Sequence, residues 1–192
     1  MKISSYAFIF LMVLTVSISG CAHHGDEVNG EEYRTGEIFF QYPAGWNTFY
    51  EFWSSDFNFN YTPHNYPDLD TEEVAGVLDP ASSTPHEKYT TWVKVYKKSL
   101  PAGSSLESVF SASYPQNSSS FKIITNTSVE IRGNNSYELV YQKYRGENLY
   151  QVKDVWFAGR ENVYIISCWT LPLNYQKNEN KFQVIIDSFT VL

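Results

Sequence analysis

The stretch "SYELVYQKYRGENLYQVKDVWFAGRENVYIISCWT", residues 136–170, decides the fold class of this chain. It contains three runs rich in β-branched and aromatic residues, separated by "RGEN" and "GREN", which supply the Gly and Asn that tight turns need. This pattern predicts three consecutive antiparallel strands. In the first run Tyr137, Leu139 and Tyr141 share one face, whereas Val140 and Tyr144 share the other, so neither face is cleanly polar. We therefore expect a sheet that is covered on both sides.

Similar patterns predict further strands upstream, and two segments have a helical period instead. The strands are "FKIITNTSVEI", "YTTWVKVYKKSL" and, with a weaker pattern, "EVAGVLDP". In "GSSLESVFSASY", Ser104 and Glu107 have the spacing of a capping box at the start of a helix. In "NKFQVIIDSF", Phe182, Ile185, Ile186 and Phe189 have the spacing of one buried helix face. The expected fold class is α+β, with an antiparallel sheet sandwiched between helices.

The first 20 residues have the features of an export signal. Lys2 is followed by a mostly apolar run of thirteen residues from Tyr6 to Ile18, which is shorter than the about 20 residues that span a bilayer. The next residues, Ser19-Gly20-Cys21, resemble the end of a prokaryotic lipobox, which predicts a lipid attached to Cys21. The alternative is an ordinary signal peptide that contains a cysteine. The lipobox predicts an exported protein that is anchored to the outer side of the cell membrane.

Residues 21–36 are polar and contain three glycines, so we expect a flexible tether. His23 and His24 are adjacent in it, and two neighbouring side chains on a mobile segment make a poor metal cage, since a structural zinc site usually has four ligands. Residues 37–192 then form one domain.

The charge and the cysteines exclude several classes of protein. The formal net charge of −7 becomes −8 once Lys2 leaves with the signal, which argues against nucleic acid as a partner. Cys168 is the one cysteine left after Cys21, so a disulfide-stapled scaffold is excluded. Its apolar surroundings predict a buried thiol.

The order of several short motifs resembles the PsbP-like family, relatives of the extrinsic PsbP subunit of photosystem II. The motifs are "FQYPAGW" with Phe40, Tyr42, Pro43 and Trp46; "SSLESVF"; Gly133, Tyr137, Glu138 and Leu139; and an ending with Phe182, Ile185, Ile186, Ser188 and Phe189. The resemblance implies an antiparallel sheet between helices and accessory or binding roles more often than catalysis. It also implies lipid-anchored relatives in bacteria and methanogenic archaea. None of the plant protein's metal-binding residues can be matched here, and residues 49–88 form an insertion relative to the family pattern.

No catalytic motif is visible, and we expect neither an enzyme nor a cofactor. Asp68 and Asp70 begin like a calcium loop, but its sixth position is Glu73 where glycine is needed. The acidic group Asp68, Asp70, Glu72 and Glu73 is a weak metal candidate, and a solvated loop is the simpler interpretation. The histidines of the insertion, His64 and His86, are expected at the surface. Glycosylation patterns begin at four asparagines, Asn60, Asn117, Asn126 and Asn134.

The aromatic insertion is the most informative feature for function. Residues 39–66 hold twelve aromatic side chains, whereas the chain-wide 17% predicts about five. Those that match the family opening, from Phe39 to Trp46, are expected in the core. The later ones, Trp53, Phe57, Phe59 and Tyr61, either close the open side of the sandwich or form an exposed surface for an envelope glycan or protein.

These observations predict a lipid-anchored, envelope-facing and non-catalytic binding or accessory module. A purely structural envelope lipoprotein is the first alternative. A hydrolase that acts on envelope material through Asp68, Asp70 or His64 is the second, and it has less support because no nucleophile and base are visibly paired.

Overall fold

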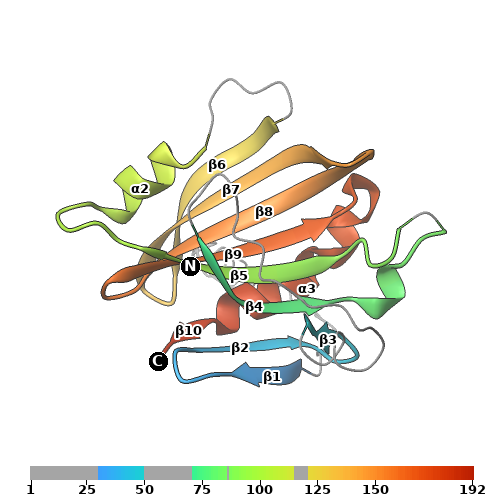
Figure 1. The fold of residues 1–192 in the computed structure, drawn as a ribbon, viewed down its shortest axis with the longest axis horizontal. Coiled ribbons are helices and arrows are strands. Elements are labelled where there is room, and N and C mark those ends of the chain that lie inside the picture. The colour runs from blue at the N-terminus through green and yellow to red at the C-terminus, as the bar shows by residue number, and fades with distance from the viewer. Residues whose placement is uncertain (1–29, 50–70, 86, 115–120) are drawn as a thin grey trace, which may run out of the picture.

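The protein is described by a computed structural model over residues 30–49, 71–85, 87–114 and 121–192 (Figure 1). These residues form two antiparallel sheets, two α-helices and two short 3-10 helices. The seven-stranded sheet has the order β3 (Asn47–Thr48), β4 (Glu72–Leu78), β5 (Trp92–Ser99), β9 (Asn162–Thr170), β8 (Asn148–Ala158), β7 (Asn134–Arg145) and β6 (Phe121–Ile131). The three-stranded sheet has the order β1 (Gly30–Arg34), β2 (Ile38–Pro43) and β10 (Thr190–Val191). The helices are α2 (Leu106–Ala112), α3 (Tyr175–Ser188), η1 (Pro80–Ser82) and η2 (Pro172–Asn174).

The central strands β5, β8 and β9 of the seven-stranded sheet are buried on both faces, as the sequence predicts, whereas the edge strand β6 is mostly exposed. In β9, Tyr164 and Ile166 belong to one apolar cluster, which they share with α3 and β2. Ile165 and Trp169 point to the opposite face and belong to a second cluster, which they share with α2. This alternation is the period of two expected for a strand with apolar residues on both faces. The α+β prediction of an antiparallel sheet between helices is confirmed, and the small sheet joins α3 on its side of the large one.

Tight turns set the register of the predicted meander. Strands β6 and β7 pair up to Ile131 and Asn134, so only Arg132 and Gly133 connect them. Both residues have positive φ, +53° and +76°, as the turns that match the twist of a hairpin require. Strands β7 and β8 likewise pair up to Arg145 and Asn148.

Helix α3 buries the predicted apolar stripe. Phe182, Ile185 and Ile186 are at most 1% exposed, and Phe189 is buried one position after the helix ends. The helix begins at Tyr175, earlier than the apolar period alone suggests. Among the described residues, no helix is both long and apolar enough to cross a membrane.

The predicted capping box of α2 is displaced by one residue. The N-cap is Ser105, whose hydroxyl accepts a hydrogen bond from the Ser108 N–H (3.1 Å), and the Ser108 hydroxyl accepts one from the Ser105 N–H (3.1 Å). The prediction of Ser104 and Glu107 was wrong because a serine at the third helical position closes the box as a glutamate would. Glu107 lies in the first turn instead, where its negative charge interacts favourably with the positive end of the helix dipole.

The expected tether of residues 21–36 is wrong at its C-terminal end, because Gly30–Arg34 form β1. Pairing with β2 stabilises this polar strand, and the Tyr33 ring stacks on Phe40 with centroids 4.9 Å apart. The Glu31 carboxylate accepts hydrogen bonds from the Tyr42 hydroxyl and the Gly45 N–H, both at 3.1 Å. Backbone pairing and these contacts replace the apolar burial that the segment lacks, so the folded part includes residues before Glu37.

The segment 49–88 is in part a strand of the main sheet. Strand β4 pairs with β5 from Glu72↔Lys97 to Leu78↔Trp92, so the weak strand pattern at 73–80 is confirmed. Gly76 has a steric role there, since a Cβ on it would lie 2.6 Å from a ring carbon of Phe49. The family-type opening is buried at Phe40, Tyr42 and Trp46 as predicted, with exposures of 0–4%. Phe39 is only half-buried.

Candidate functional site

A cleft lies where the end of β4 and the start of α3 meet the turn that follows β2. Its volume is about 620 Å³. Four segments of the chain line it: Pro43, Ala44, Gly45 and Trp46; Asp79, Ala81, Ser82, Ser83 and Thr84; Thr91; and Asn174, Lys177, Asn178 and Lys181. A volume of this size is within the usual range of about 300–1,000 Å³ for small-molecule sites.

The turn after β2 forms one wall of the cleft. The Trp46 N–H donates to the Pro43 carbonyl at 3.1 Å, and Gly45 between them has a φ of +79°. A positive φ at this position of a tight turn favours glycine. The Trp46 side chain is 3% exposed and meets the Phe182 ring edge-on, with centroids 6.4 Å apart. The turn is therefore anchored in the core that α3 shares with the sheet.

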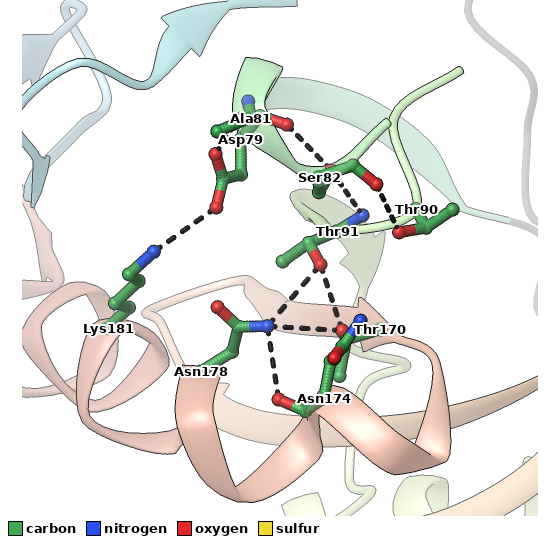
Figure 2. A network of polar contacts seen from close by, with 9 residues as sticks. All are labelled: Asp79, Ala81, Ser82, Thr90, Thr91, Thr170, Asn174, Asn178 and Lys181. Atoms are coloured by element: carbon green, nitrogen blue, oxygen red, sulfur yellow. Dashed lines mark hydrogen bonds and ion pairs between the residues drawn. The ribbon is translucent and has the colours of Figure 1, made fainter. Parts of the chain in front are cut away.

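Asp79 organises the opposite wall (Figure 2). Its carboxylate accepts a hydrogen bond from the Ala81 N–H (2.9 Å), which caps η1, and its carbonyl accepts one from the Ser82 hydroxyl (2.6 Å). The Ser82 hydroxyl also accepts a bond from the Thr91 N–H (3.0 Å). These bonds fix the η1 turn to the start of β5 and hold the Asp79 carboxylate toward α3.

Asn178 lies at the base of the cleft. Its side-chain amide nitrogen approaches three oxygens, the hydroxyls of Thr91 (3.4 Å) and Thr170 (3.3 Å) and the carbonyl of Asn174 (3.1 Å). The two threonine hydroxyls also bond to each other at 2.9 Å. The Asn174 carbonyl can only accept a hydrogen bond, so the group that faces it must be the NH₂ of the amide. This argument fixes the orientation of the Asn178 side chain.

The Oδ1 oxygen of Asn178 points away from this network toward the side where Lys181 and Asp79 lie (Figure 2). Among the described residues none donates a hydrogen bond to this oxygen, which keeps contact with solvent although the residue as a whole is only 4% exposed. An acceptor that is held rigidly at the base of a cleft and left open on that side is therefore suited to receive a donor from a ligand.

Lys181 and Asp79 form an ion pair across the cleft. The ammonium Nζ lies 3.1 Å from Oδ2 of Asp79, and the two side chains are 32% and 11% exposed. The same Nζ lies 5.8 Å from the centroid of the Trp46 ring, which is within the range of a cation–π contact. Lys177, one turn earlier on α3, lines the cleft, is exposed and has no ion pair within the described ranges.

A second polar network lies under α2 on the other face of the sheet. The fully buried Asp154 carboxylate accepts hydrogen bonds from the hydroxyls of Tyr114 (2.9 Å), Tyr141 (3.0 Å) and Ser167. Burial raises the pKa of Asp154, and the three hydroxyl donors oppose that increase. The Trp156 indole N–H donates to the Tyr114 hydroxyl at 2.6 Å. Because its partners are all side chains of the core, this network acts as structure: it attaches the end of α2 to the sheet.

Most of the site residues predicted from sequence lie outside the described residues. These are Cys21, His23, His24, Trp53, Phe57, Phe59, Asn60, Tyr61, His64, Asp68, Asp70, His86 and Asn117. Of the acidic group, Glu73 is not a solvated loop residue, because it lies in β4 and pairs with Lys94 at 2.8 Å. Within the described ranges, no three His, Cys, Asp or Glu side chains come together as a metal site would require. Asn126 and Asn134 are exposed, and Cys168 is buried as predicted.

The cleft residues were missed by the sequence reasoning, although one signal was present. Asn178 precedes Phe182 by four positions, so it extends the apolar stripe of α3 by one turn. A polar residue on a buried stripe needs buried partners. Those partners are Thr91, which directly precedes β5, and Thr170, the last residue of β9, and only the folded sheet brings them together.

The fold places the protein in a class of α+β domains in which an antiparallel sheet lies between helices. Its sequence matches the family model described as PsbP-like protein over residues 17–191. The chain therefore belongs to the PsbP-like protein family, which confirms the family resemblance. A search of curated proteins found no match.

Several solved structures share the fold at low identity. The solution structure of cyanobacterial PsbP (CyanoP) from Synechocystis sp. PCC 6803 aligns with a TM-score of 0.53 and 16% identity, over 86% of this chain and 94% of that one. LpqN, described as involved in cell envelope biogenesis of Mycobacterium tuberculosis, aligns with a TM-score of 0.54 and 14% identity, over 88% and 87%. A protein of Bacteroides thetaiotaomicron aligns with a TM-score of 0.52 and 10% identity, over 85% and 48%. Such similarity establishes the fold, whereas function depends on the site.

Proposed function

We propose that this PsbP-like protein is a lipid-anchored, envelope-facing accessory module that binds a small polar ligand in its cleft without transforming it. One observation carries the binding role: the buried Asn178 amide uses its nitrogen within the fold and leaves its oxygen open to the cleft. Such an arrangement can accept a hydrogen bond from a ligand donor, and a typical hydrogen bond of this kind contributes about 0.5–1.5 kcal/mol net.

The envelope location rests on the sequence before the described residues. The order Ile18-Ser19-Gly20-Cys21 supports lipid attachment at Cys21. The likeness to LpqN, a protein described as involved in cell envelope biogenesis, is compatible with this location. Mass spectrometry of the mature N-terminus tests the anchor: we expect a lipid on Cys21 and release of the C21S variant from membranes. An unmodified protein in the soluble fraction would refute the anchor.

A cleft-filling substitution tests the binding role. Ala81 lines the cleft and is exposed, so Ala81→Trp places an indole in the cleft without disturbing the core. Ala112 is exposed at the end of α2, and Ala112→Trp is therefore the matched control. We expect the wild type and A112W to be retained on envelope material from the source organism and A81W to be lost from it. Equal retention of all three would contradict cleft binding and favour the purely structural alternative.

The aromatic segment stays a separate prediction for a second contact surface. Trp53, Phe57, Phe59 and Tyr61 lie outside the described residues. In the same retention assay, Trp53→Ala combined with Tyr61→Ala weakens binding if these rings contact an envelope glycan or protein. Release of products from the envelope material by the wild type would instead support the hydrolase alternative, which depends on Asp68, Asp70 or His64.

A further inference from the structure

We propose that the ligand of the cleft is an acidic sugar, that is, a polyhydroxylated ring with a carboxylate such as a hexuronate. This inference rests on the proposed function, because it names the ligand class of the same cleft. Three properties of the lining carry it: its net charge, its hydrogen-bonding groups and its mixed polar and apolar walls.

The cleft is positively charged on an acidic protein. Its charged lining residues are Lys177, Lys181 and Asp79, and Lys181 is neutralised by Asp79 at 3.1 Å. Lys177 therefore contributes one unbalanced positive charge, whereas the whole chain has a formal net charge of −7. A cleft whose charge is opposite to that of its surroundings raises the local concentration of anions. The described lining contains no arginine, so it offers no planar fork for bidentate phosphate recognition, and the single unpaired ammonium of Lys177 can pair with one carboxylate.

The hydrogen-bonding groups suit hydroxyls. Asn178 Oδ1 accepts a hydrogen bond and cannot donate one, so it excludes a bare carboxylate at the base of the cleft and favours a ligand O–H. The hydroxyls of Ser83 and Thr84 also line the η1 wall. Each already donates one hydrogen bond and accepts one within the fold, so each can accept one more from a ligand O–H.

The remaining walls are apolar. Pro43, Ala44 and Ala81 line the cleft beside these polar groups. A sugar ring presents C–H groups as well as hydroxyls, so it complements such a mixed lining better than a small inorganic anion does. When Asn178 Oδ1 accepts a hydrogen bond from a ligand hydroxyl, the carboxylate of the ligand lies toward Lys177 at the exposed edge of α3.

Protein-observed NMR titration of the full-length lipoprotein in detergent tests the inference with three probes: sodium glucuronate, glucose and sodium acetate. Glucuronate has both the hydroxyls and the carboxylate, glucose lacks the carboxylate, and acetate lacks the hydroxyls. We expect glucuronate to bind about twofold to fivefold more tightly than glucose, as a partly exposed ion pair implies, and acetate to bind more weakly than either. In the Lys177→Gln variant, the affinity for glucuronate falls by the same twofold to fivefold, and the affinity for glucose does not change. Lys122→Gln, at an exposed lysine on β6, has the same charge change and keeps both affinities.

Each outcome decides one part of the inference. Equal affinities for glucuronate and glucose, or equal effects of K177Q and K122Q, would overturn the assignment of the carboxylate to Lys177. If acetate binds as tightly as glucuronate, the inference that the ligand is a sugar is refuted. If no probe binds while the A81W substitution still abolishes envelope retention, the acidic sugar is refuted and the binding role stands. If A81W does not affect retention, the binding role itself is refuted.

Discussion

The ion pair between Lys181 and Asp79 should couple α3 to the η1 turn by about 1 kcal/mol. At their separation of 3.1 Å, two unit charges attract by ~1.3 kcal/mol in bulk water and about 5 kcal/mol at an effective dielectric constant of 20. Lys181 is 32% exposed and Asp79 is 11% exposed, so solvent screens much of the attraction. Ordering of the lysine side chain and loss of hydration offset part of the remainder, which leaves a net coupling toward the upper end of the range for partly exposed pairs.

A double-mutant cycle measures this coupling by urea unfolding. Asp79→Asn removes the charge and keeps an oxygen to accept from the Ala81 N–H, whereas Lys181→Met removes the charge and keeps an apolar stem beside Trp46. The control cycle uses Lys97 and Glu37, which are 22% and 55% exposed at 2.8 Å, and its coupling should be smaller and vanish near 1 M salt. A coupling at Asp79–Lys181 that is zero within error, or no larger than that of the control pair, would refute the reasoning.

Three further predictions concern the core. Gly76→Ala should lower the free energy of unfolding by about 1–3 kcal/mol, because the added Cβ would lie 2.6 Å from the Phe49 ring. Gly36→Ala is the control, since no atom lies within 4 Å of its Cβ. Equal costs for the two variants would contradict the steric contact. The raised pKa of Asp154 means that the fold favours its protonated form, so unfolding free energy should fall as pH rises from the ordinary value of 3.8 through the pKa in the fold, by at most ~1.4 kcal/mol per pH unit. The D154N variant should show a flatter dependence of unfolding free energy on pH, and an unchanged dependence would mean that other groups cause it. Burial raises the pKa of the Cys168 thiol, so iodoacetamide should label it only on unfolding; rapid labelling of the native protein would show that the thiol is accessible.

The sheet could be predicted from sequence because its signal is local. Alternation of apolar residues in 136–170 and the Gly and Asn of the turns determine the three strands, and the structure pairs them as predicted. Strand β1 could not be predicted in this way. "GEEYR" has little apolar surface, and its stability comes from the β2 backbone and from the Tyr33–Phe40 stack, which depend on a partner elsewhere in the chain.

The cleft could not be predicted because its parts are individually ordinary. A turn with glycine, a serine-rich turn, two lysines on a helix and one threonine occur in most proteins, and they become a site only when four distant segments meet. Asn178 is the exception. A polar residue at a stripe position of α3 indicates a buried polar contact, but the sequence does not tell whether that contact lies within the fold or with a ligand. The structure shows that the amide nitrogen makes contacts within the fold, and the proposed function assigns the oxygen to a ligand.

The side-chain amide of Asn178 gives the most direct test of the claim that the cleft is a binding site. The measurement is a ¹H–¹⁵N NMR titration of the protein with soluble glycan released from the envelope of the source organism. The account predicts that the Asn178 NH₂ signal shifts together with the backbone amides of residues 79–84 and 174–181. Shifts that cluster instead on α2 or β6, with the Asn178 signal unchanged, would contradict it.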